Sequence, residues 1–194
     1  GNDTSKTTGK VMGGNLPVVE DPSDMPHGSF VLVPVAFLLG RAAPYNPRRD
    51  LQAEDPEFQQ LQGSLHEFGL VQNIVWNRRT GNIVGGHQRI KTAKADGITH
   101  VPVCVVDLSL NRERLLNLAL NKIEGAWDTD RLIAVLADLQ AQDLASEGLT
   151  IGLSGFKPEE IAALMGPQDY TGQGGGGGSG LDEGTKLTLQ QKFI

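Results

Sequence analysis

The stretch NIVGGHQR, residues 82–89, holds the most informative local pattern in the chain. A short β-branched run passes through two glycines into a polar segment, which predicts a strand, a tight turn and a helix from about Gly86 to Asp96, ended by Gly97. N–H groups in the first turn of a helix lack partners within the helix, so they form a ready anion site. We therefore interpret 85–89 as a phosphate-binding turn; the alternative is a tight turn alone.

Short elements of both kinds surround this turn. Apolar and β-branched runs predict strands at 30–35, 73–76, 82–84 and 101–106, and Thr80-Gly81 predicts a hairpin between the second and third of these. Apolar periodicity predicts helices at 56–68, 111–123, 130–140 and 158–165. Asp55 marks the first of these helices as its N-cap, and Gly69 ends it. The mixture predicts one α+β domain over about 29–166.

The two ends of the chain have a different composition. Residues 1–28 lack periodic apolar positions, which predicts a flexible N-terminal arm. Residues 167–185 include a run of glycines typical of a flexible linker. Because residues 186–194 end on an apolar stretch without a helix stop, we expect them to begin a further region.

Composition excludes several classes of protein. No apolar run approaches the roughly 18 residues of a membrane-spanning helix, and the N-terminus has no signal-peptide core, so we expect a cytoplasmic protein without membrane contact. The single Cys104 excludes an internal disulfide and a multi-cysteine zinc site. The net charge is −6, but the acidic excess lies outside 41–131. Overall charge therefore does not exclude phosphate from the middle of the chain.

Two further clusters contain candidate ligand contacts. Asn46-Pro47-Arg48-Arg49 places two guanidinium groups beside a rigid turn, and arginine binds phosphate with two parallel hydrogen bonds. Asn121-Lys122, near a predicted helix end, suits a ligand contact or a simple helix cap. Trp76 is interpreted as a core residue. Trp127, just before the predicted helix at 130–140, is interpreted as an apolar staple, with base stacking as the alternative.

Together these motifs resemble the ParB/sulfiredoxin superfamily over most of residues 30–128. Within it, the chain looks most like the ParB-like N-terminal domains of phage or plasmid DNA-modification proteins, which often precede a DNA methyltransferase domain. The resemblance implies a ParB/sulfiredoxin-like domain at 29–128, with a small mixed sheet and flanking helices, and a C-terminal helical extension at 129–166. It rests on NPR at 46–48, FGLVQNIV at 68–75, IVGGHQR at 83–89 and LALNK at 118–122.

The resemblance also implies a set of nucleotide contacts. The phosphate-binding turn corresponds to Gly85, Gly86, His87, Gln88 and Arg89. Gln72 takes the place of a nucleotide-contacting glutamine. Arg48 is expected to make an extra phosphate contact, and Asn121 is expected to be a further site residue. Sulfiredoxins keep a reactive cysteine between the glycines and the histidine. Here Gly86 and His87 are adjacent, so sulfiredoxin chemistry is not expected.

A second departure concerns metal binding. Partition proteins place a metal-holding glutamate before the asparagine, whereas Leu120 precedes Asn121 here, and we expect no metal ligand set in the chain.

The function predicted from these patterns is binding of a nucleotide, CTP or ATP with magnesium, or of nucleic-acid phosphate, in a DNA-modification or DNA-maintenance protein. One alternative is a nuclease, or an NTP-dependent phosphotransferase or NTPase, on the same fold. Such chemistry needs a base or a metal, and Glu67, Glu124 and Asp128 are the carboxylates near the motifs. A further alternative is an assembly module, with a homodimer as one form.

Overall fold

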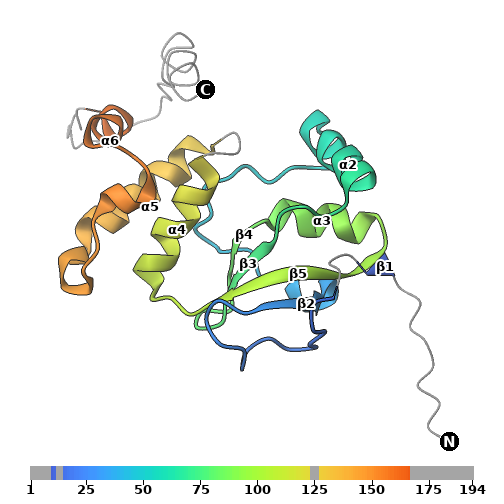
Figure 1. The fold of residues 1–194 in the computed structure, drawn as a ribbon. Coiled ribbons are helices and arrows are strands. Elements are labelled where there is room, and N and C mark those ends of the chain that lie inside the picture. Colours follow the sequence, from blue (N-terminus) through green and yellow to red (C-terminus); the bar gives the residue numbers. More distant parts are fainter. Residues whose placement is uncertain (1–9, 12–14, 123–126, 167–194) are drawn as a thin grey trace, which may run out of the picture.

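A computed structural model describes residues 10–11, 15–122 and 127–166 (Figure 1). The predicted linker at 167–185 and the region at 186–194 lie outside the described residues. The strands are β1 (Lys10–Val11), β2 (Phe30–Pro34), β3 (Ile74–Asn77), β4 (Ile83–Gly85) and β5 (Ile98–Val106). The helices are α1 (Val35–Leu38), α2 (Pro56–Phe68), α3 (His87–Ala95), α4 (Leu110–Lys122), α5 (Thr129–Ala141) and α6 (Pro158–Met165), with 3₁₀ turns at Leu144–Glu147 and Ile151–Ser154.

The strands form one mixed sheet around β5, which confirms the predicted fold class. β5 pairs antiparallel with β2 and parallel with β3, and β4 pairs antiparallel with β3 as the predicted hairpin. β5 starts three residues earlier than the predicted strand, and its added end pairs with the short β1. Helices α1, α2 and α3 pack against the sheet in one core. Trp76 is 1% exposed within that core, as predicted, and its Nε1 donates to the Gly81 carbonyl at 3.0 Å.

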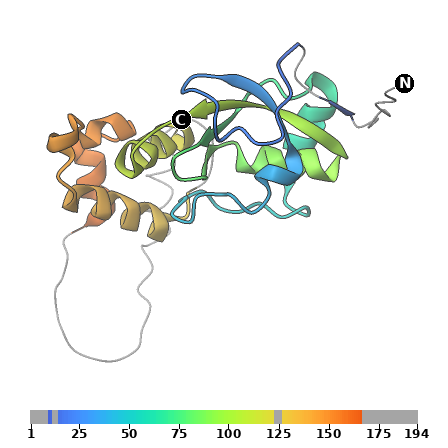
Figure 2. The ribbon, with the colours of Figure 1, turned by 90° about the horizontal axis from the view of Figure 1, so that it is seen from below.

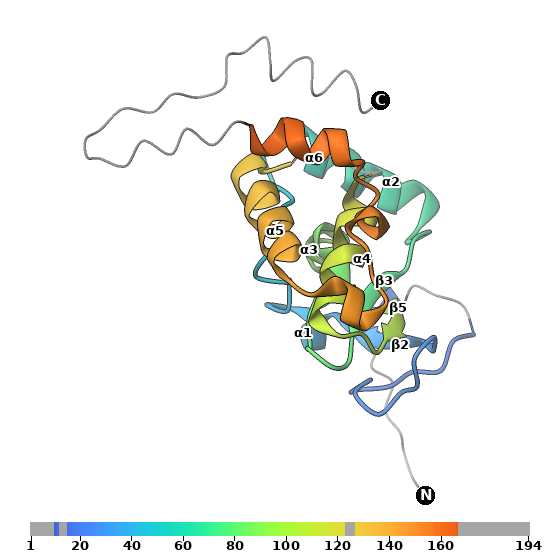
Figure 3. The ribbon, with the colours of Figure 1, turned by 90° about the vertical axis from the view of Figure 1, so that its left-hand side faces the viewer.

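The helices after α4 form a second core beside the sheet. Figure 2 shows α5 and α6 gathered next to α4, away from the strands, and Figure 3 looks onto the same group from its own side. Leucines of α4 and α5 meet Phe156 and Ile161 there. Trp127 packs on this core with its ring 5.7 Å from that of Phe156. This packing at the start of α5 favours the staple over a base-stacking role.

The sequence predicts a flexible arm over 1–28, and within the described part of it residues 15–28 make backbone contacts with the domain. Leu32 of β2 donates its backbone N–H to Pro17 at 2.8 Å and accepts from Val19 at 2.9 Å. Gly28 donates to the Val105 carbonyl at 2.7 Å. Backbone pairing of this kind needs no apolar periodicity in the added segment, which is why composition alone did not indicate it.

The start of α2 also differs in detail from the prediction. Asp55 stands at the N-cap position, but its side chain makes no cap hydrogen bond with the helix. Its carboxylate accepts from the Gln52 N–H at 2.8 Å and pairs with Arg49 Nη2 at 3.1 Å. The helix ends as predicted at Gly69, which has φ 74°.

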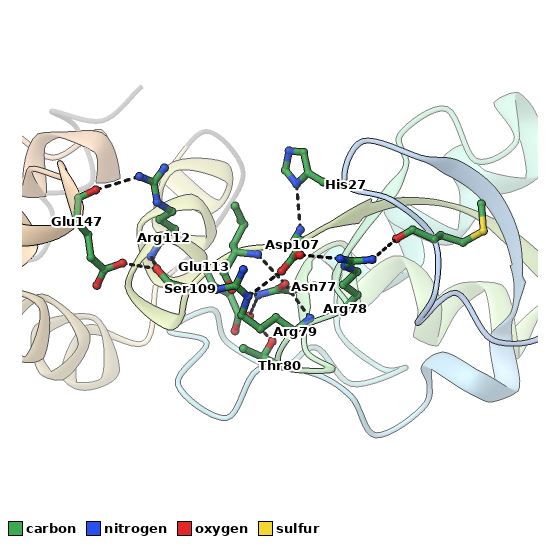
Figure 4. A network of polar contacts seen from close by, with 12 residues as sticks. His27, Asn77, Arg78, Arg79, Thr80, Asp107, Ser109, Arg112, Glu113 and Glu147 are labelled. Carbon is green, nitrogen blue, oxygen red and sulfur yellow. Dashed lines mark hydrogen bonds and ion pairs between the residues drawn. The ribbon is translucent and has the colours of Figure 1, made fainter.

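A buried carboxylate joins α4 to the β3–β4 hairpin (Figure 4). Glu113 is 0% exposed, and its Oε1 accepts from Tyr45 Oη at 2.7 Å and from Asn82 Nδ2 at 2.8 Å. Its Oε2 accepts from Asn77 Nδ2 and Thr80 Oγ1. Three of the four donors belong to the end of β3 and the hairpin turn. The carboxylate therefore fixes the position of that turn against the helix.

Replacing Glu113 with Gln tests this anchor. The new amide presents N–H groups where Asn77 and Thr80 donate, so buried donors lose their acceptor. We expect the free energy of unfolding to fall by roughly 2 to 4 kcal/mol, measured by urea denaturation. The matched change at Glu57, exposed on α2, should stay within about 0.5 kcal/mol. Equal effects of the two substitutions would contradict the anchor.

Candidate functional site

A cavity of about 340 Å³ lies where four separate segments meet: the loop around Arg48, the segment after α2, the β4–α3 turn and the end of α4. All eight residues singled out from the sequence line it. They come together with four others, and the full lining is Arg48, Leu61, Gln72, Asn73, Val75, Gly85, Gly86, His87, Gln88, Arg89, Leu120 and Asn121. Their contact with a ligand stays a prediction.

The two glycines of the turn lie close to protein side chains, and Gly86 also has a backbone conformation that favours glycine. Gly86 is the N-cap of α3 with φ 92°, a left-handed conformation that disfavours side chains. A Cβ added there would meet Ile74 Cδ1 at 2.7 Å. A Cβ added at Gly85 would meet Leu120 Cδ1 at 2.9 Å. The sequence interpretation placed both glycines in a phosphate-binding turn, with a tight turn alone as the alternative, and the structure shows that protein side chains border the space that each glycine leaves open.

The cavity is electropositive at the start of α3. The N-cap is a glycine, so no side chain caps the first-turn N–H groups, which carry the positive end of the helix dipole. Arg89 lies in that first turn, and Arg48 reaches the same cavity from a different segment. Two guanidinium groups at one helix N-terminus match the charge and the oxygen geometry of a phosphate.

His87 lies behind this surface in a chain of hydrogen bonds. Its Nδ1 is 3.0 Å from Asn46 Nδ2, and Asn46 Oδ1 accepts from the Arg48 backbone N–H at 3.2 Å and from Asn121 Nδ2 at 3.3 Å. Burial lowers the pKa of His87 to about 4, with a further contribution from the Arg48 charge. The sequence places Asn46 in a turn and in the NPR motif at 46–48, without a contact of its own. Its role as the link between two predicted site residues depends on contacts distant in sequence.

Gln88 is oriented toward the Arg48 loop. Its side chain is 2% exposed, and its Nε2 donates to the Arg49 carbonyl at 3.1 Å and lies 3.2 Å from Asp50 Oδ1. Lys91, one turn further along α3, donates to the same Asp50 oxygen at 2.8 Å. The start of α3 therefore holds the loop that delivers Arg48 to the cavity.

The carboxylates considered for catalysis are not part of this cavity in the described residues. Glu67 is exposed on α2, and Asp128 caps α5 by accepting from the Arg131 N–H at 3.1 Å. Glu124 lies outside the described residues. The described ranges contain no group of three or more His, Cys, Asp or Glu side chains placed to hold a metal. Cys104 is half-buried on β5, and burial raises the pKa of its thiol.

Residues 28–122 match the family model of the ParB N-terminal domain. The mixed sheet and its flanking helices agree with this match, so residues 28–122 are similar to the ParB N-terminal domain. No curated protein matches the chain at a significant level. None of the helices in the described residues is both long and apolar enough to span a bilayer.

Three solved structures are similar to the chain. A Pnob8-like ParB-N domain shares 13% identity over 62% of this chain and 48% of its own, with a TM-score of 0.45, so the match spans about half of that protein. The C-terminally truncated chromosome-partitioning protein ParB from Caulobacter crescentus, complexed with CTP-γ-S, shares 22% identity over 71% of this chain and 77% of its own, with a TM-score of 0.43. Its complex with the centromeric parS site shares 20% over 69% of each chain, with a TM-score of 0.47.

Substituting Gly86 with Ala tests the geometry of the turn. The left-handed conformation costs about 1 to 2 kcal/mol for a residue with a Cβ, and contact with Ile74 adds about 1 to 3 kcal/mol. Gly28 has φ 85° and open space around it, so Ala at that position should show the conformational cost alone. We expect Gly86→Ala to lower the free energy of unfolding by more than Gly28→Ala in urea titrations. The reverse order would show that Ile74 does not restrict the turn.

Proposed function

We propose that this ParB-like N-terminal domain binds a phosphate-bearing ligand, a nucleotide or the backbone of nucleic acid, in the cavity at the start of α3. One observation carries the proposal: Arg48 and Arg89, from distant parts of the sequence, border the same cavity as the uncapped helix N-terminus. A single phosphate group can accept hydrogen bonds from guanidinium groups and first-turn N–H groups together. Each of these features alone occurs on many protein surfaces.

The rest of the lining suits a nucleotide. A volume of about 340 Å³ falls within the range of small-molecule sites. Gln72 and Asn121 offer amide groups, while Val75 and Leu120 form an apolar wall. CTP and ATP are therefore the first ligands to test, each with and without magnesium. The described lining contains no carboxylate, so we expect magnesium to arrive bound to the phosphate oxygens.

The resemblance noted in the sequence supports a wider role. We propose that the domain serves a cytoplasmic DNA-modification or DNA-maintenance protein of phage or plasmid type, and that a DNA methyltransferase domain follows it in the parent chain. Methyl transfer to DNA by the full-length protein tests this assignment. Binding is favoured over nuclease, phosphotransferase or NTPase activity because Glu67 and Asp128 do not line the cavity. Phosphate release from CTP or ATP, or cleavage of DNA, would reverse that preference.

Arg89→Ala is the main test of the phosphate site. Loss of a charge-assisted contact should weaken binding by roughly 1.5 to 3 kcal/mol, which is tenfold or more in affinity, without changing the melting temperature. Calorimetric titrations with CTP, ATP, GTP, UTP and duplex DNA measure the effect. Arg79→Ala is the matched control, because Arg79 pairs with Asp107 in a different network.

Salt dependence separates the two ligand classes. DNA affinity should fall steeply as salt rises, whereas a mononucleotide should show a shallower dependence and discriminate among bases. If Arg89→Ala keeps wild-type affinity for every nucleotide and for DNA, the phosphate-site proposal is wrong. Mass that rises with protein concentration, with no response to any of these ligands, would favour the assembly module.

A further inference from the structure

We infer that His87 is a positioning residue: as a neutral imidazole it holds the loop at 46–50, and with it Arg48, against α3 without itself contacting the ligand phosphate. The expected effect of His87 on ligand affinity rests on the proposed function. The structural part of the inference, the docking of the loop, can be tested without any ligand. It differs from the sequence interpretation, in which His87 was one of the phosphate contacts.

Both ring nitrogens of His87 are occupied by protein amides. Nδ1 is 3.0 Å from Asn46 Nδ2, and Nε2 is 2.9 Å from Gln88 Nε2. Asn46 is 6% exposed and Gln88 is 2% exposed, so these amides lie in the interior, where water does not easily replace them. A ligand phosphate would have to displace one of them to reach a ring nitrogen.

The orientation of Asn46 requires a neutral ring. Asn46 Oδ1 accepts from the Arg48 backbone N–H, which can only donate, so the amide nitrogen faces His87. An imidazolium would oppose this N–H with a second N–H. A neutral ring with its lone pair at Nδ1 accepts the hydrogen bond. The neighbouring charges also favour a neutral ring, because Arg48 and Lys91 disfavour the protonated form and Asp50 alone among them favours it.

The Gln88 side chain lies against the other ring nitrogen. With Nδ1 accepting, the ring proton lies on Nε2 and needs an acceptor. Gln88 Oε1 is buried without a partner among the described residues. A half-turn of that amide would bring Oε1 to the ring N–H, in place of the contacts with Arg49 and Asp50. Either orientation leaves no unoccupied nitrogen on His87 for a phosphate.

Polar contacts hold the loop over α3. A second cavity, of about 390 Å³, lies between the two segments and is bordered by Asn46, Arg48 and Asp50 on one side and by His87 and Lys91 on the other. The loop therefore does not pack closely on the helix along this stretch. Its attachments to α3 include the His87–Asn46 contact, the bonds from Lys91 and, when its amide nitrogen faces the loop, the bonds from Gln88. The His87 contact is the one closest to Arg48, because its partner Asn46 accepts a hydrogen bond from the Arg48 backbone N–H.

Two substitutions separate positioning from ligand contact. His87→Asn keeps an acceptor oxygen on Cγ where Nδ1 stood, whereas His87→Leu keeps bulk but leaves the Asn46 amide unsatisfied. We expect amide hydrogen exchange at 46–50 to rise about tenfold in His87→Leu, with a similar loss of CTP affinity, and to stay near wild type in His87→Asn. His66→Asn is the control, because His66 pairs with Asp96 outside the cavity. Equal loss in both His87 variants, or exchange at 46–50 unchanged in His87→Leu, would overturn the inference.

The pH dependence supplies a second measurement. The pKa of His87 is lowered in the folded protein, so docking of the loop is favoured above the ordinary value of 6.5 and weakens as pH falls toward about 4. Exchange at 46–50, corrected for intrinsic rates, should rise over that interval in wild type and not in His87→Asn. Nitrogen-15 spectra should show a neutral ring midway through it, and an imidazolium there would refute the inference. Absence of binding of CTP, ATP and DNA in wild type would refute the proposed function while leaving these ligand-free results to decide the role of His87.

Discussion

The buried Glu113 carboxylate is the constraint on which the geometry of the cavity depends. A charged group without exposure is tolerated only when hydrogen bonds replace its lost hydration, and here four neutral donors do so. Three of them come from the β3–β4 hairpin, so the hairpin has one favourable position on α4. β4 runs directly from that hairpin to Gly85, which lines the cavity. The contacts of Glu113 with the hairpin therefore also fix where Gly85 lies.

The face of α4 that carries Glu113 also contacts the segments that line the cavity. Asn117 and Asn121 follow Glu113 at intervals of four residues, so the three side chains share a face of the helix. Asn117 Nδ2 donates to the Val84 carbonyl at 2.8 Å, and Asn121 reaches Asn46. The helix thus holds the hairpin turn, the end of β4 and the Arg48 loop in succession. The end of β4 and the Arg48 loop, which are far apart in sequence, meet at the cavity because both contact α4.

The sequence predicted the elements whose signals are local. The strand, two glycines and helix at 82–96 and the limits of α2 and α6 follow from residues within a few positions of one another. Contacts between distant segments were not predictable in this way. The backbone pairing of Pro17 and Val19 with β2 leaves no side-chain pattern, and Asn46 resembles any turn asparagine. Glu113 stands between Arg112 and Arg114, a pattern typical of an exposed helix surface, although the fold turns it inward.

The groups that attract an anion to the cavity are charged, whereas the side chains that hold Arg48 in place beside it are mainly neutral. Arg48 and Arg89 supply positive charge. The groups nearest Arg48 that link its loop to α3 and α4 are the neutral side chains of Asn46, Gln88, Asn121 and His87, while the Lys91–Asp50 ion pair holds the loop further along α3. Neutral groups can be buried once they are hydrogen-bonded, whereas a further buried cation would repel the guanidinium groups. A neutral His87 therefore lets the loop dock against α3 while leaving the electrostatic attraction for phosphate to the two arginines and the helix N-terminus.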